Sequence, residues 1–297
     1  MRVVVNWSGG KDCCLSCYEA ISQGYEVSTL LNFVFTDYGR STPIRISSLL
    51  KYLFTDVGRN TPHKVSTMLT LVFRAVGKRT PHKVSTLFGA VNLNATRRMV
   101  PHEVAPEIVA MQAKAMELPI IQREVTWGTF EDQFKTAISK LERANAEGVV
   151  WGIIPPDTML DDSRKLKKYI NLRVQVDWID KLCGDLGSKA IFPLWEKTPE
   201  QILAELVEKG FEVVVVVVNP EFVSEKWLGH KIDHDFIDEL HRLNRERGVH
   251  LCGDEYHTLV TDGPLFKKRL KVLQSRKVSR DGYSILDMSK VELVDKD

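Results

Sequence analysis

Cysteine is scarce in this 297-residue chain, and the five cysteines present are an odd number. They therefore give no paired disulfide framework of the kind found in small secreted proteins. Cys14 and Cys17 form a C-x-x-C pair, but no second such pair accompanies it, so a closed zinc site is poorly supported. Cys13 and Cys17 lie on one face of an expected helix, which suits packing. We interpret the three as buried structural thiols.

Long apolar runs are also missing. No apolar stretch reaches about 18 residues, the length typical of a transmembrane helix. The opening run MRVVVNW is too short for the hydrophobic part of a secretory signal peptide. We therefore expect no membrane partner and a cytoplasmic location. Hydrophobic residues make up 43% of the chain, which is enough for a substantial core.

Net charge is almost absent at +2, but its distribution is uneven. Residues 36–98 carry 11 Lys and Arg against only Asp37 and Asp56, so this block is strongly basic and the rest of the chain is acidic. Such a block favours an anionic partner, although a solvated surface gives the same pattern.

A tandem repeat occupies the basic block, about residues 36–100. Val27, Ile46, Val65 and Val84 recur every 19 residues, and glycine and proline positions keep the same spacing. Self-similarity at a fixed period indicates a duplicated unit. The later copies have apolar residues at helical spacing, so we expect short helices there. Two interpretations stay open, a tolerated duplication and a basic arm that binds a partner.

The rest of the sequence alternates between short β-branched runs and amphipathic segments, which predicts an α/β fold with a parallel sheet. The run Val213–Val218 is apolar throughout, as in a strand buried on both faces. We expect residues 155–171 to form an exposed loop and residues 276–297 to form a tail that is partly ordered at best. The expected strands are 2–7, 25–35, 120–125, 148–152, 190–194 and 213–218, and the expected helices are 13–23, 105–116, 130–146, 174–184 and 199–209.

The first strand leads into Ser8-Gly9-Gly10-Lys11-Asp12, directly before an expected helix. Glycines at such a turn let the backbone approach a ligand, and the free N–H groups of the helix favour an anion. The patterns G-x-x-x-x-G-K-[ST] and G-x-G-x-x-G are both absent. The segment is therefore a candidate phosphate cradle of another type.

This loop resembles the PP-loop, S-G-G-x-D-[ST], of the ATP pyrophosphatases. The resemblance implies that Ser8, Gly9, Gly10, Lys11, Asp12 and Cys13 bind ATP. Cys13 stands where that family has a hydroxyl, and a thiol is a much weaker donor. Lys11 is expected to act as a point charge on the phosphates, and Asp12 to contact Mg²⁺ directly or through water.

Further motifs follow in order, and together they resemble the diphthine–ammonia ligase family. They are PHEV at 101–104 running into QAKAMELPI, EGVVWG at 147–152, FPLW at 192–195, KGF at 209–211, KWLG at 226–229, and 253–264. The resemblance implies a Rossmann-like HUP domain at 1–190 that binds ATP and carries the repeat as an insertion. It also implies a C-terminal α/β substrate domain at 191–275.

A second polar segment, CGDEYHTLVTDGP at 252–264, matches the substrate-side signature of that family, but it is two residues shorter. Glu255 and His257 are candidates for acid–base work. Alternation along a strand places His257 and Leu259 on one face and Tyr256 and Thr258 on the other. The resemblance implies that Gly253, Glu255, Tyr256, Thr258 and Trp227 bind the substrate.

The resemblance implies a ligase that adenylates the carboxylate of diphthine on translation elongation factor 2 and then transfers ammonia, releasing AMP and pyrophosphate. Lys11, Asp12, Glu255 and His257 are the expected catalytic residues, with ATP, Mg²⁺ and ammonium as reactants or cofactor. Two alternatives remain. One is a PP-loop enzyme that acts on tRNA, favoured by the basic block; the other is an ATP- or AMP-binding protein with impaired catalysis, favoured by Cys13 and the shortened segment.

Overall fold

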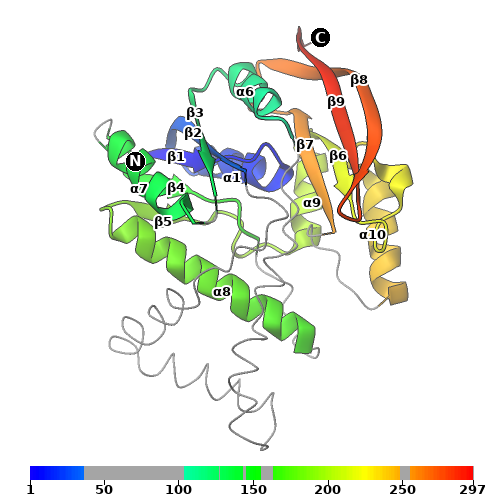
Figure 1. Ribbon diagram of the computed structural model, residues 1–297, viewed down its shortest axis with the longest axis horizontal. Helices are drawn as coiled ribbons and strands as arrows, with labels where there is room; N and C mark the ends of the chain where they lie inside the picture. The colour runs from blue at the N-terminus through cyan, green and yellow to red at the C-terminus, as the bar shows by residue number, and fades with distance from the viewer. Residues whose placement is uncertain (37–103, 127, 143–144, 155–162, 248–254, 297) are drawn as a thin grey trace, which may run out of the picture.

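The computed structural model describes residues 1–36, 104–126, 128–142, 145–154, 163–247 and 255–296 (Figure 1). The predicted repeat and almost all of the basic block lie outside these residues, as do Gly253 and residues 155–162 of the predicted loop.

The first half of the fold is a five-stranded sheet in the order β3-β2-β1-β4-β5, with every pair parallel. The predicted α/β class with a parallel sheet is confirmed. The order reverses at β1, so the crevice between the carboxyl ends of β1 and β4 is the place where such sheets bind ligands. The strands are β1 (Arg2–Asn6), β2 (Glu26–Phe35), β3 (Ile120–Val125), β4 (Gly148–Val150) and β5 (Lys189–Ile191).

Helices cover both faces of this sheet, because its central strand is apolar at successive positions. Val3 and Val5 pack into one core with α1 and α6, whereas Val4 packs into a second core with α7 and α8. Burial on both faces explains why the strand reads as an unbroken valine run. The helices are α1 (Lys11–Ser22), α6 (Pro106–Ala115), α7 (Phe130–Glu142) and α8 (Ser163–Gly184).

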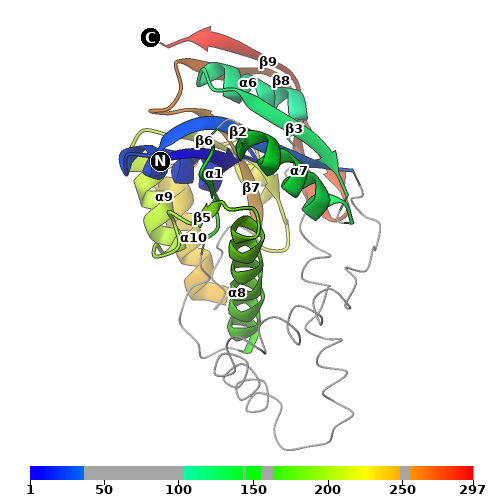
Figure 2. The same ribbon diagram turned by 90° about the vertical axis from the view of Figure 1, so that its left-hand side faces the viewer.

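The second half is a four-stranded antiparallel sheet in the order β7-β6-β9-β8. Its core is continuous with the core under α1, since one buried cluster includes Val5, Val215 and Ile285. Figure 2 shows β8 and β9 running together as a long hairpin. The elements are α9 (Pro199–Glu208), β6 (Glu212–Val218), η3 (Glu225–Trp227), α10 (His234–Arg247), β7 (Tyr256–Asp262), β8 (Lys268–Arg280) and β9 (Tyr283–Asp295).

Two expectations from the sequence are wrong. The helix α8 begins at Ser163, so residues 163–171 are not a loop; this stretch is rich in Lys, Arg and Leu, which favour helix without an apolar stripe. The partly ordered tail expected at 276–297 is instead the end of β8 and the whole of β9. Because β9 pairs with β6, which is distant in sequence, local periodicity does not reveal it.

An ion-pair network joins three segments of the second half. Glu212 on β6 contacts Lys231 at 2.6 Å, and Arg269 on β8 donates to both of its oxygens at 3.1 and 3.2 Å. Burial acts to raise the pKa of Glu212, but the hydrogen bonds and charges of Lys231 and Arg269 outweigh burial and leave that pKa below its ordinary value. The ionised form is therefore more stable in the folded chain.

We expect Glu212→Gln to lower the free energy of unfolding by about 1 kcal/mol at neutral pH, because two cations lose their shared partner. A carboxyl whose pKa is depressed by folding stabilises the fold above its unfolded pKa, and this stability is lost as the pH falls through the folded pKa. Urea unfolding should thus show the two proteins converging below about pH 4. Glu208→Gln, at an exposed position, is the control; an equal loss there would contradict the network's role.

Candidate functional site

The glycine loop lies at the carboxyl end of β1, beside the crevice where the strand order reverses. Gly9 has a φ of +85°, which favours glycine, and Gly10 caps α1 without a side chain. The first N–H groups of a helix have no partner inside the helix. No described residue accepts a hydrogen bond from the N–H of Gly10, Asp12 or Cys13. The loop therefore presents three open backbone donors.

The thiol of Cys13 forms hydrogen bonds with two residues of the loop. Its Sγ lies 3.4 Å from both the N and the Oγ of Ser8 and 3.2 Å from the carbonyl oxygen of Gly10. Burial raises the pKa of the Cys13 thiol, so it stays protonated. The sulfur thus contacts both Ser8 and Gly10, while the backbone N–H of Cys13 has no acceptor among the residues that the structure describes.

Lys11 is almost fully buried, at 4% exposure. Its ammonium group donates to both carboxylate oxygens of Asp12, at 2.7 and 2.9 Å, and lies 5.6 Å from the centre of the Tyr256 ring. The Asp12 side chain keeps 30% of its surface exposed. The structure thus brings together Lys11 and Asp12 from the loop with Tyr256 from the second sheet, as a charged pair against an aromatic ring.

The outer edge of β7 meets the glycine loop. The N–H of Val260 donates to the carbonyl of Gly9 at 3.0 Å, and the hydroxyl of Thr258 accepts from the N–H of Lys11 at 3.0 Å. The side chains of Tyr256 and Thr258, two residues apart, therefore both contact Lys11, and Val260 contacts Gly9 through its backbone. The loop thus pairs with the outer edge of β7 at Val260.

The remaining predicted residues of this segment are less close to the loop. His257 lies opposite Val217 on β6. Glu255 is half-buried just before β7, and its carbonyl accepts from the N–H of Asn219 at 2.8 Å. Gly253 lies outside the described residues.

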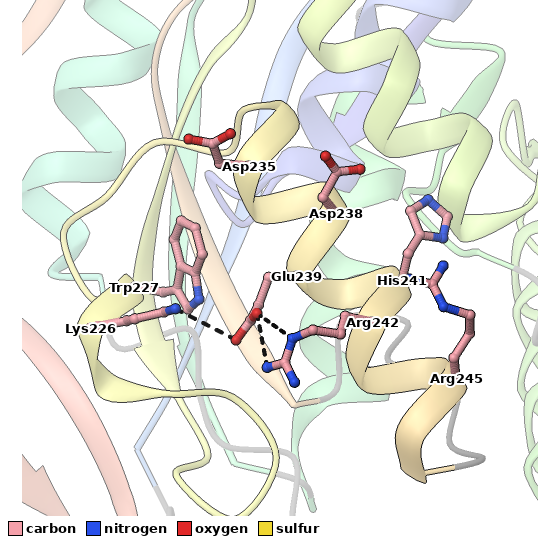
Figure 3. A pocket seen from close by; sticks show the side chains of 8 residues that line it. All are labelled: Lys226, Trp227, Asp235, Asp238, Glu239, His241, Arg242 and Arg245. Carbon is pink, nitrogen blue, oxygen red and sulfur yellow. Dashed lines mark hydrogen bonds and ion pairs between the residues drawn. The ribbon is translucent and has the colours of Figure 1, made fainter.

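Trp227 is connected to the loop only through other rings. Its ring lies 5.1 Å from that of Phe236, which lies 5.2 Å from that of Tyr256. Trp227 lines an open hollow of about 700 Å³ between η3 and α10 (Figure 3). Within this hollow, Glu239 pairs with Lys226 at 3.7 Å and with Arg242 at 3.0 Å. These charges largely neutralise one another.

Sequence reasoning missed two residues at the loop. Gln112 on α6 donates to the carbonyls of Gly9 and Val260. Gly152 follows β4, and a Cβ there would lie 2.6 Å from the N of Cys13. Both residues belong to motifs that carry the family resemblance, but spacing alone gives neither a role.

No metal cluster is evident at this site. In the part of the chain that the structure describes, no group of three or more His, Cys, Asp or Glu side chains is arranged to hold a metal ion. Asp12 remains the one predicted metal ligand. The described helices also include none with the length and apolar character needed to cross a membrane.

Comparison with known proteins supports the resemblance drawn from the motifs. Residues 198–294 match the family model described as diphthamide synthase C-terminal domain. A diphthine–ammonia ligase of Schizosaccharomyces pombe is 34% identical over 121 residues, which span 40% of this chain and 20% of the relative. A diphthine–ammonia ligase of Danio rerio is 25% identical over 287 residues, or 91% of this chain and 86% of the relative.

Among solved structures, the chain aligns with a predicted subunit of tRNA methyltransferase from Methanocaldococcus jannaschii DSM. That alignment has a TM-score of 0.32 and 12% identity, and covers 89% of this chain and 98% of the other. The order and direction of the strands carry the fold assignment. The resemblance to the diphthine–ammonia ligase family is confirmed by the sequence comparisons, and the family model extends it through the hairpin of β8 and β9.

Burial of the thiols makes a prediction about their chemistry. Burial raises the pKa of Cys13, Cys14 and Cys17, and it raises the pKa of Cys183 to about 12. In a Cys252→Ser variant at about pH 8, we therefore expect no rapid reaction with a thiol reagent such as DTNB, since thiolate is the reactive form. In guanidinium chloride all four remaining thiols should react. Rapid reaction of any of them in the native protein would contradict the packing described here.

Proposed function

We propose that this chain is an ATP-dependent ligase of the diphthine–ammonia ligase type. The observation that carries the proposal is the loop after β1, where three open N–H groups lie beside Lys11 and Asp12 at the reversal of the strand order. Open helix N–H groups and a lysine are the elements that bind phosphate. The relatives of the same name support the reaction type.

The fit of a triphosphate to these residues rests on Gly152. A Cβ at this position would lie 2.6 Å from the N of Cys13 and 2.8 Å from the carbonyl carbon of Asp12. A side chain there would cover the N–H groups at the start of α1. The glycine keeps that backbone accessible, which is the usual reason for glycine where phosphate approaches.

Four consecutive residues at the end of the loop and the start of α1 have a part in the proposed reaction. The N–H groups of Gly10, Asp12 and Cys13 bind phosphate oxygens, and Lys11 supplies a positive charge for the pyrophosphate as it leaves. Asp12 offers carboxylate oxygens, the ligand type that Mg²⁺ prefers, and Mg²⁺ when bound neutralises phosphate charge. The loop is fixed before substrate arrives, so little reorganisation is needed.

The proposed overall reaction forms an amide. ATP is a substrate that gives its adenylyl group to the diphthine carboxylate of elongation factor 2 and loses pyrophosphate; ammonia then displaces AMP. Glu255 and Trp227 are proposed to bind the diphthine side chain or the surface around it. We propose that His257, whose strand position is opposite Val217 on β6, orients the diphthine side chain or the ammonia together with Glu255.

A second candidate function has one observation in its favour. The N–H of Lys11 is occupied by Thr258, and Lys11 itself is held by Asp12. A loop with fewer open donors suits an ATP- or AMP-binding protein that does not release pyrophosphate. The experiment below distinguishes it from the ligase.

We expect AMP and pyrophosphate to accumulate when the purified chain is incubated with ATP, Mg²⁺, ammonium and diphthine-bearing elongation factor 2. Release should require elongation factor 2 and should be abolished in Asp12→Asn. ATP binding without release under any condition would overturn the ligase and support the binding protein. Release with tRNA in place of elongation factor 2 would support the PP-loop enzyme that acts on tRNA.

Gly152→Ala should weaken ATP binding about tenfold or more, because the added methyl group meets the backbone of Asp12 and Cys13. Isothermal titration calorimetry with ATP measures the effect. Gly184→Ala is the matched control, since a Cβ there meets nothing within 4 Å. Unchanged ATP affinity in Gly152→Ala would show that phosphate does not approach the start of α1.

A further inference from the structure

The side chain of Gln112 is completely buried, at 0% exposure, and both ends of its amide are occupied. Its Nε2 donates to the carbonyl of Gly9 at 2.9 Å and to that of Val260 at 2.7 Å. Its Oε1 accepts from the indole N–H of Trp7 at 3.1 Å. The reversed amide would place Oε1 against two carbonyl oxygens, so the partners allow one orientation only. A buried amide satisfied in this way is fixed in place.

The carbonyl of Gly9 is held by two donors at once. Besides Gln112, the N–H of Val260 donates to it at 3.0 Å. In a trans peptide the C=O and the following N–H point in opposite directions, and the structure contains no cis peptide among its described residues. Fixing the carbonyl of Gly9 toward Gln112 and Val260 therefore directs the N–H of Gly10 away from them.

We propose that Gln112 is a positioning residue for the phosphate loop. By holding the carbonyl of Gly9, it turns the N–H of Gly10 toward the phosphate groups of the nucleotide. The inference rests on the function proposed above and adds a residue that no loop motif includes. Gln112 touches no substrate; it acts through the peptide between Gly9 and Gly10.

The contact restricts the residue type at both positions, glycine at 9 and glutamine at 112. A Cβ on Gly9 would lie 2.5 Å from Oε1 of Gln112, so a larger residue at position 9 displaces the amide. Conversely, only a side chain with a terminal N–H donor reaches both carbonyls from α6. Glutamate has the same shape but places an oxygen against each carbonyl, which repels instead of binding.

The same amide links the loop to the second sheet. Because Nε2 bonds the carbonyls of Gly9 and Val260 together, the position of β7 is transmitted to the peptide that carries the Gly10 donor. Substrate contacts on β7 and phosphate contacts on the loop thus depend on one shared side chain.

The test compares Gln112→Glu and Gln112→Met with Gln122→Glu. Gln122 is the matched control because its Nε2 also donates twice, to Asn32 at 3.1 Å and to the carbonyl of Pro106 at 2.9 Å, and neither acceptor is a residue of the loop; Asn32 in turn donates to the carbonyl of Trp7, which precedes the loop. Isothermal titration calorimetry with ATP and with pyrophosphate gives affinity, and thermal melting gives stability. Gln112→Met carries no charge and keeps the comparison available if Gln112→Glu does not fold.

We expect pyrophosphate affinity to fall about tenfold or more in both Gln112 variants, as for the loss of one charge-assisted donor. Gln122→Glu should lower the melting temperature with affinity unchanged. In ¹⁵N spectra, the Gly10 amide should shift on adding pyrophosphate to the wild type and not to Gln112→Met.

Two results would overturn the inference, and they are distinguishable. Wild-type affinity in folded Gln112→Met would show that Gln112 does not position the loop, while the proposed function stands. A wild-type chain that binds neither ATP nor pyrophosphate would instead overturn the proposed function, and this inference with it.

Discussion

The constraint on which this structure depends is the unpaired edge of β7. Antiparallel pairing with β6 satisfies one side of the strand and leaves a row of backbone groups on the other. The glycine loop fills part of that row, since the N–H of Val260 donates to the carbonyl of Gly9, while the N–H of Lys11 donates to the side-chain hydroxyl of Thr258. A loop that binds phosphate must keep some N–H groups open, yet a buried loop must satisfy its carbonyls. The contact with β7 meets both needs, since it uses the Gly9 carbonyl and leaves the Gly10 N–H.

The buried charge of Lys11 follows from the same arrangement. A lysine at this depth requires a partner, and its immediate neighbour Asp12 supplies one while Tyr256 covers the ammonium group. The pair keeps a positive and a negative group at the start of α1, where the partial positive charge of the helix also acts. Tyr256, which lies over the ammonium group, belongs to β7. The second sheet therefore affects the charge environment of the loop as well as the geometry of the loop.

Much of the fold could be predicted from local pattern. The run Val3–Val5 predicts a strand buried on both faces, and the glycines after it predict a tight turn into a helix; both are found. The expected placement of Tyr256 and Thr258 on one side of the strand agrees with their contacts to Lys11. The hairpin at the end of the chain was not predictable in this way, because β9 is stabilised by β6. The second half of α8 was expected as a helix at 174–184, but its first part was not, because the helix lacks a clear amphipathic pattern. Local sequence reports propensity, but long-range pairing decides these elements.

The distinction between local pattern and long-range contact also explains which residues of the candidate site could be found from the sequence. Ser8, Gly9, Gly10, Lys11 and Asp12 are contiguous, so a motif identifies them, whereas Gln112 lies 103 residues from Gly9 and has no spacing signal. Its role is visible only when its three hydrogen bonds are seen together. The predicted boundary near residue 190 stays a prediction for a related reason: one buried core includes Val5 and Val215, so the two halves share packing as well as the loop. The glycine loop, whose Gly9 carbonyl is bonded by Val260 from one half and by Gln112 from the other, therefore depends on both halves for its conformation.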